Sequence, residues 1–127
     1  AEDCLSRAAA SGARLVRAML CALERTSHAA TLRTQAVTDP LTGLPNRHAL
    51  QKAIDHAMAM ARRKGRALAV LFVDLDGFKN VNDDCGHEAG DRVLQAIARR
   101  FAVRTRDMDT VARIGGDEFV VVMEDLD

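Results

Sequence analysis

The sequence predicts an α/β or α+β fold in which helices cover a small sheet, because segments with helical and strand-like apolar patterns alternate along it. Apolar residues recur at helical spacing over residues 50–61 and again over residues 93–101. Between them, residues 67–73 form an apolar run of strand length, which we expect to be buried on both faces. Two further strand-like runs, residues 110–114 and 119–123, flank a Gly-Gly pair that is typical of a hairpin.

The composition indicates a globular protein of ordinary charge balance. The chain has 127 residues, of which 48% are hydrophobic, with 18 basic and 18 acidic side chains. At this length we expect one domain with a short extension. No apolar run approaches the roughly 20 residues that span a bilayer, and zero net charge removes the electrostatic basis for binding a nucleic-acid polymer. Three scattered cysteines argue against a disulfide framework, so we expect a cytoplasmic protein without membrane contacts in this chain.

The N-terminal segment, residues 1–37, favours a helix because it contains no proline and many alanines. Six small or apolar residues follow the heptad spacing of a coiled-coil seam: Leu5, Ala8, Gly12, Leu15, Met19 and Ala22. Two interpretations stay open here, a helix lying on its own domain and a stalk that pairs two subunits. Asp39 precedes Pro40, which disfavours further helix, so we divide the chain into a stalk, residues 1–37, and a domain, residues 38–127.

The domain begins with a loop that contains two prolines and a glycine within residues 38–47. Asn46 is a suitable N-cap for the first helix, and Gly65, after three basic residues, suits its C-terminal end. A polar, glycine-bearing stretch, residues 74–90, follows the first strand. Two or three strands give the helices little to pack on, so we expect either that the natural protein continues beyond Asp127 or that the surface on which the helices pack lies elsewhere.

Carboxylates follow the ends of the predicted strands. Asp74 and Asp76 come directly after the apolar run, and Asp117 and Glu118 lie on the glycine turn of the hairpin. If the hairpin lies beside the apolar run, Asp74 and Asp117 converge. Two carboxylates on one Mg²⁺ ion are typical of phosphoryl- or nucleotidyl-transfer sites. For any one of these residues taken alone, the alternative is a solvated side chain.

Other kinds of site fit these residues less well. A strand ending in Asp-x-Asp-Gly also occurs in haloacid-dehalogenase-like phosphatases, but Phe78 and Lys79 stand where other residues are expected. Cys85 stands where a calcium loop needs glycine. The histidines and cysteines lack zinc-ligand spacing, and we expect His48 and His56 on the outer face of a helix.

Several motifs together resemble the GGDEF family, the diguanylate cyclases. Arg113-Ile-Gly-Gly-Asp-Glu-Phe119 is similar to the family signature, Asp39-Pro-Leu-Thr-Gly-Leu-Pro-Asn-Arg47 to its entry loop, and Asp74-Leu-Asp-Gly-Phe-Lys79 to its metal-and-phosphate strand end. Three residue pairs resemble the family segment that lies beside guanine: Asn82-Asp83, Gly86-His87 and Gly90-Asp91. The resemblance implies an α+β fold of the nucleotidyl-cyclase type, with an antiparallel-containing sheet flanked by helices and a long helix before it. The family domain continues past the hairpin, so the resemblance also implies that this copy is C-terminally incomplete.

The resemblance implies a diguanylate cyclase, which condenses two GTP molecules into cyclic di-GMP and two pyrophosphates in a homodimer. Asp74, Asp117 and the carbonyl of Leu75 would hold Mg²⁺ (or Mn²⁺). Asp117 would also be the candidate base, and Glu118 would bind a second metal or support the site. Seven further residues would contact GTP, at its phosphates, at its guanine base or elsewhere on the nucleotide: Gly77, Phe78, Lys79, Asn82, Asp91, Gly115 and Gly116.

A second site is implied by Arg106 and Asp109, which match the family's inhibitory Arg-x-x-Asp in its offset from Gly115. We therefore expect product inhibition by cyclic di-GMP. Two other functions stay open. One is a catalytically silent module that binds GTP or cyclic di-GMP within a larger, phosphodiesterase-containing protein, and the other is a unit for dimerisation and signalling. The resemblance favours the dimerising interpretation of residues 1–37, and activity is expected of the longer protein rather than of this chain alone.

Overall fold

The computed structural model describes residues 12, 14–18, 21 and 36–127, and the chain divides into two compact units, Ala1–Gln35 and Ala36–Asp127. In the first unit, all the described residues are helical. Of the predicted seam, Gly12 and Leu15 belong to this helix and are exposed, whereas the other four positions lie outside the described residues. The seam and the stalk therefore stay predictions. In the part of the chain that the structure describes, no helix is long and apolar enough to cross a membrane.

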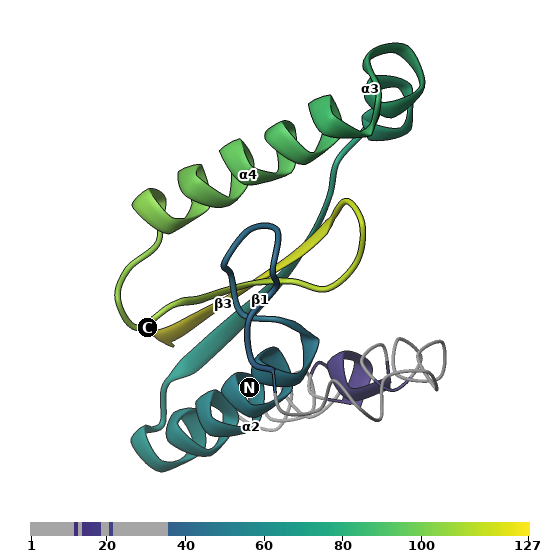
Figure 1. Cartoon of the computed structure of the whole chain (residues 1–127). Coiled ribbons are helices and arrows are strands. Elements are labelled where there is room, and N and C mark those ends of the chain that lie inside the picture. Colours follow the sequence, from purple (N-terminus) through teal and green to yellow (C-terminus); the bar gives the residue numbers. More distant parts are fainter. Residues whose placement is uncertain (1–11, 13, 19–20, 22–35) are drawn as a thin grey trace. The chain divides into compact units, whose positions relative to one another are not determined.

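The second unit is an α+β domain, as the sequence predicts. Its sheet contains β1 (Ala67–Asp74), β2 (Thr110–Arg113) and β3 (Glu118–Leu126) in the order β1-β3-β2, with both pairs antiparallel. Helices α2 (Arg47–Lys64) and α4 (His87–Arg104) lie on opposite sides of this sheet (Figure 1). The central strand β3 is therefore covered on both faces, and four consecutive residues of it, 119–122, are buried.

Helix α2 begins and ends where its capping residues predict. The Asn46 side chain accepts a hydrogen bond from the Ala49 amide at 3.0 Å, and Gly65 adopts the left-handed conformation, with φ of 64°. Leu50, Ile54 and Ala57 form its buried face. His48 and His56 are exposed, so their predicted place on the outer face of the helix is confirmed.

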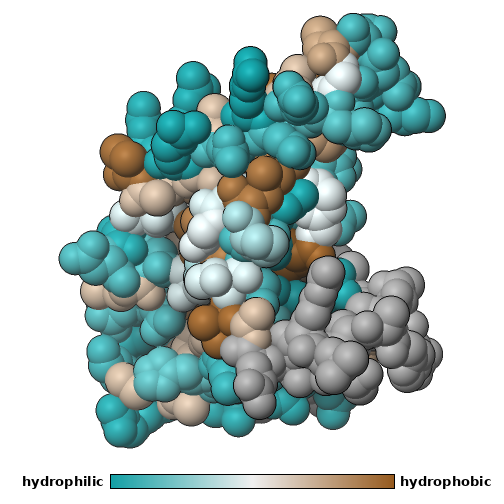
Figure 2. Space-filling model, viewed as in Figure 1, coloured by the Kyte–Doolittle hydropathy of each residue, from teal (hydrophilic) through white to brown (hydrophobic). Residues whose placement is uncertain are grey.

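The second face of the sheet is closed by α4. Leu94 and Ala98 of this helix pack with Phe119 of β3, and the Phe101 and Phe119 rings lie 5.6 Å apart. Partly buried residues from five segments complete this cluster: Leu41, Leu44, Val73, Leu75, Phe78, Ile97 and Phe101. The outer surface of α4 is mostly hydrophilic (Figure 2). This division between apolar and polar faces explains why the apolar spacing over residues 93–101 predicts the helix correctly.

One expectation from the sequence is corrected, and one helix is found that the sequence does not predict. The apolar run does form β1, but it is not buried on both faces: Leu71 is 42% exposed and Phe72 is 38% exposed. Among the described residues β1 pairs only with β3, which makes it an edge strand. The polar stretch 74–90, for which the sequence predicts no element, forms α3 (Phe78–Cys85) and the first turn of α4.

Candidate functional site

The site is built where β1 ends and the β2–β3 hairpin turns. The strand register places Asp74 opposite Glu118, and the Leu75 amide donates a hydrogen bond to the Asp117 carbonyl at 3.2 Å. The Asp74 and Asp117 carboxylates therefore converge. Their proximity has an electrostatic consequence: the charge of Asp117 raises the pKa of Asp74 above its usual value, with desolvation adding to the effect.

Arg113 stabilises the hairpin turn. Its guanidinium donates two hydrogen bonds to the Gly116 carbonyl, at 3.2 and 3.0 Å, and forms an ion pair with Asp39 at 3.0 Å. Asp39 in turn accepts hydrogen bonds from the amide and the hydroxyl of Thr42, at 2.9 and 2.8 Å. Partial burial raises the pKa of Asp39, but the hydrogen bonds from Thr42 and Arg113 outweigh it, so the pKa lies below its usual value.

The loop before α2 makes further contacts with the same turn. The Arg113 amide donates to the Pro45 carbonyl at 3.0 Å, and the Arg47 guanidinium donates to the Ile114 carbonyl at 2.8 Å. The entry loop thus supports the carboxylate-bearing hairpin. Asp39, Arg47 and Arg113 are absent from the site residues predicted from the sequence, although all three lie in the motifs that carry the family resemblance.

Asp74 and Asp117 fit a divalent cation, because a cation between them would relieve the repulsion that raises the pKa of Asp74. Among the residues that the structure describes, no group of three or more acidic, histidine or cysteine side chains is placed to hold a metal. Two carboxylates suit Mg²⁺, which keeps water ligands and shares its sphere with substrate phosphates. The Leu75 carbonyl now accepts a hydrogen bond from the Phe78 amide at 3.3 Å, and its second lone pair is the one a metal would use.

The turn glycines differ in what surrounds them. A Cβ atom added to Gly115 would lie 2.7 Å from the Glu118 carboxylate, whereas one added to Gly116 would meet nothing within 4 Å. Open space at Gly116 is compatible with close approach of a ligand. At Gly115 the space is taken by Glu118, whose exposed carboxylate lies back over the turn.

The segment after β1 presents its backbone rather than its side chains. Leu75 and Phe78 pack into the core around Phe119, which leaves their main-chain atoms at the end of the strand. Gly77 adopts a left-handed conformation, with φ of 75°, and a Cβ there would meet no atom within 4 Å. Lys79 is exposed at the start of α3.

The two predicted guanine contacts lie on α3 and α4. Asn82 belongs to α3, and Asp91 is exposed in the first turns of α4, directly after the buried residue Gly90. The Asn82 side chain lies against Gly90 so closely that a Cβ on that glycine would fall 1.9 Å from the amide oxygen. The packing of α3 on α4 therefore brings the amide to the helix that carries Asp91.

The predicted inhibitory pair lies near the other end of β3. Arg106 binds both carboxylate oxygens of Asp109 at 3.0 Å and also donates to the Glu124 carbonyl at 2.9 Å. Asp109 has only 4% of its side chain exposed, and the hydrogen bond from Arg106 lowers its pKa. Glu124 is roughly 20 Å along β3 from Glu118, at about 3.3 Å per residue. The structure thus brings Arg106 and Asp109 together, well separated from Asp74 and Asp117.

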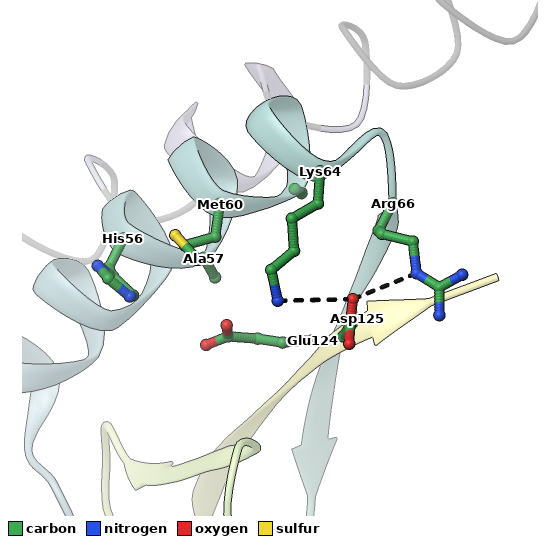
Figure 3. Close-up of a pocket in the computed structure, with 8 residues that line it drawn as sticks. His56, Ala57, Met60, Lys64, Arg66, Glu124 and Asp125 are labelled. Carbon is green, nitrogen blue, oxygen red and sulfur yellow. Dashed lines mark hydrogen bonds and ion pairs between the residues drawn. The ribbon is translucent and has the colours of Figure 1, made fainter.

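A small cavity of about 60 Å³ lies between the end of α2 and the end of β3. Figure 3 shows Lys64 and Arg66 directed toward Asp125, at 3.9 and 3.2 Å. The cavity is far smaller than the roughly 300 Å³ of typical ligand pockets. It also lies at the opposite end of the sheet from Asp74, so it has no part in the carboxylate site.

Comparison with known proteins agrees with this geometry. A family model described as "Diguanylate cyclase, GGDEF domain" matches residues 36–127. The chain belongs to the GGDEF family. Its relatives with named functions include both cyclases and a phosphodiesterase. The diguanylate cyclase DgcP of Pseudomonas aeruginosa is 48% identical over 97 residues, which cover 76% of this chain and 14% of DgcP. The cyclic di-GMP phosphodiesterase NbdA of the same species is 44% identical over 103 residues, which cover 80% of this chain and 13% of NbdA.

A solved GGDEF structure shares the fold. The GGDEF domain of DgcB from Caulobacter crescentus, in complex with c-di-GMP, matches with a TM-score of 0.67 and 36% identity. The match covers 70% of this chain and 52% of that one. The present GGDEF chain therefore spans about half the length of that structure, and a much smaller share of DgcP and NbdA.

Proposed function

We propose that this GGDEF domain serves a diguanylate cyclase, which condenses two GTP molecules into cyclic di-GMP and two pyrophosphates. The observation that carries the proposal is the convergence of Asp74 and Asp117 at the end of β1, with the effect of Asp117 on the pKa of Asp74. A nucleotidyl-transfer site needs such a pair to place a divalent cation beside phosphate oxygens. Family membership and the similarity to DgcP support the same activity.

The residues at the carboxylate site would have two roles, metal binding and proton transfer. Asp74, Asp117 and the Leu75 carbonyl would hold Mg²⁺ or Mn²⁺, which when bound neutralises the charge of the triphosphate. Asp117 would accept the proton of the 3′-hydroxyl, and the resulting oxygen attacks the α-phosphorus of the second GTP. The bond from the α-phosphorus to the bridging oxygen breaks, so pyrophosphate leaves. The same exchange on the second nucleotide closes the ring.

The remaining site residues would bind and orient GTP. The Gly77 amide would lie against the phosphates, with Lys79 nearby, as main-chain amides do in anion-binding turns. The Phe78 amide, which donates to the Leu75 carbonyl at 3.3 Å, would share its hydrogen with a phosphate oxygen. Asn82 and Asp91 recognise guanine, since the amide offers a donor and an acceptor and the carboxylate accepts from ring and amino N–H groups. Gly116 leaves the turn open to the nucleotide, whereas Gly115 leaves room for the Glu118 carboxylate and would contact the nucleotide through its main chain. Glu118 either binds a second metal or supports the first.

A homodimer is part of the proposal, because each subunit holds one GTP and the reaction joins two. Residues 1–37 would pair the subunits as a stalk. Arg106 and Asp109 would bind the product cyclic di-GMP and inhibit the enzyme, since the planar guanidinium suits both guanine and phosphate. The sequence identity to NbdA, a phosphodiesterase by name, favours a second candidate: a catalytically silent nucleotide-binding module that regulates a neighbouring domain.

Product analysis separates these two functions. GTP and Mg²⁺ are incubated with the natural full-length protein, and products are resolved by chromatography. We expect cyclic di-GMP from the parent and none from Asp117→Asn, whereas Asp84→Asn, an exposed carboxylate on α3, keeps full activity. Bound GTP without any product would instead support the regulatory module. Equal product from the parent and Asp117→Asn would refute the proposed role of the carboxylate.

A further inference from the structure

The backbone conformation at Gly90 in α4 does not require a glycine. The residue lies within the helix, its amide donates to the Gly86 carbonyl at 3.3 Å, and its φ is not in the left-handed range. Alanine would stabilise a helix better than glycine at such a position. The reason for glycine must therefore be steric.

The steric reason is the side chain of Asn82. A Cβ atom on Gly90 would lie 1.9 Å from the Asn82 amide oxygen, 3.0 Å from its Cγ and 3.2 Å from the ring of Phe78. Cβ atoms do not approach other heavy atoms to less than 3.0 Å, so the amide can lie where it does only because residue 90 has no side chain. The Phe78 ring, which packs against the core, also borders the space that a side chain at residue 90 would need.

No hydrogen bond within the described chain fixes the Asn82 amide. The Asn82 carbonyl of the main chain accepts from the Gly86 amide at 2.9 Å, but no side-chain hydrogen bond of Asn82 occurs among the described residues. Its polar atoms are thus available to a ligand, and its orientation depends on packing against Gly90. The next residue in α4 is Asp91, so the same contact sets the spacing of the two side chains proposed to recognise guanine.

We infer that Gly90 is a positioning residue for base recognition: because it has no side chain, the Asn82 amide can lie beside Asp91. This inference rests on the proposed guanine contacts of Asn82 and Asp91. In Gly90→Ala the added methyl group forces the end of the Asn82 side chain to rotate away. The atoms displaced are the ends of two side chains, and alanine favours the helix, so the fold is retained while the discrimination of guanine falls.

A double-mutant cycle tests the inference. The dissociation constants of GTP and ATP are measured, with Mg²⁺ present, for the full-length parent, Gly90→Ala, Asn82→Ala and the double variant. We expect Gly90→Ala to reduce the preference for GTP over ATP by roughly tenfold, the scale of one well-placed hydrogen bond. In the Asn82→Ala background the same change should have no further effect, because its target is gone. Val103→Ala is the control, since this residue lies in the same helix and is 83% exposed.

Each other outcome overturns a defined part of the argument. An unchanged GTP preference in Gly90→Ala, or an equal loss in both backgrounds, overturns the inference and leaves the proposed function intact. A parent protein that does not prefer GTP overturns the proposed function and the inference together. Loss of folding by Gly90→Ala in both backgrounds, followed by circular dichroism, would show that α4 itself requires the glycine and would also overturn the inference.

Discussion

Replacing Asp39 by asparagine tests whether the entry loop holds the carboxylate hairpin in place. Asp39 and Arg113 are only 15% and 16% exposed, and their ion pair joins residues far apart in the chain. Asparagine still accepts a hydrogen bond from Thr42, but it leaves the Arg113 charge without a counter-charge. A buried pair costs about 3–5 kcal/mol to break from one side and an exposed pair about 0–1 kcal/mol. For this degree of burial we expect a loss of about 2 kcal/mol in the free energy of unfolding.

The assay is urea denaturation followed by far-ultraviolet circular dichroism, because the chain contains no tryptophan or tyrosine to report by fluorescence. For a domain of this size the same loss lowers the melting temperature by roughly 10 °C. Asp84→Asn, an exposed carboxylate, is the control and should change stability by less than about 0.5 kcal/mol. A loss equally small in Asp39→Asn would refute the reasoning.

The pH dependence provides a second check on Asp39. Its pKa is lower in the folded protein than in the unfolded chain, because the hydrogen bonds from Thr42 and Arg113 outweigh partial burial. The carboxylate therefore contributes stability that is complete above the unfolded pKa, about 3.9, and that is lost as the pH falls through the folded pKa. The stability difference between the parent and Asp39→Asn should be full at pH 7 and shrink below about pH 4. A difference that stays constant down to pH 3 would contradict the assigned cause.

Three further changes have defined outcomes. Asp117→Asn should bring the pKa of Asp74 back down toward its usual value, measured by NMR titration, and an unchanged pKa would mean that the two carboxylates do not interact. Phe119→Ala should cost about 3–5 kcal/mol in urea denaturation, because Phe119 is fully buried between α4 and the sheet, and a loss below about 1 kcal/mol would contradict that packing. Arg106→Ala should raise the pKa of Asp109 and abolish tight binding of cyclic di-GMP in calorimetry; undiminished tight binding would exclude this pair as the inhibitory site.

Much of the fold could be predicted from local sequence signals. Asn46 and Gly65 bound α2 correctly, and the glycine turn between two β-rich runs gives the β2–β3 hairpin. Helix α3 has only eight residues, and its apolar spacing rests on Phe78, Val81 and Cys85 alone, which is too short a pattern to identify a helix. The exposure of β1 depends on which strands lie beside it, and an apolar run contains no information on that.

Part of the candidate site could likewise be predicted from the sequence, and part could not. Asp74 and Asp117 could be predicted because each follows a strand, and neighbouring strands bring their ends together. The ion pair between Asp39 and Arg113 joins two separate motifs, so only the tertiary structure shows it. The contact of Asn82 with Gly90 is likewise invisible in the sequence, since it depends on how α3 packs on α4.

Direct detection of the cation at the two carboxylates tests the central claim most sharply. Mn²⁺ is titrated into the full-length protein in the presence of a GTP analogue that cannot react, and free Mn²⁺ is measured by electron paramagnetic resonance. We predict a nucleotide-dependent Mn²⁺ site in the parent and in Asp84→Asn, and its loss in both Asp74→Asn and Asp117→Asn. Mn²⁺ binding that is unchanged in both of these variants would contradict the assignment of the metal site, and with it the proposed chemistry.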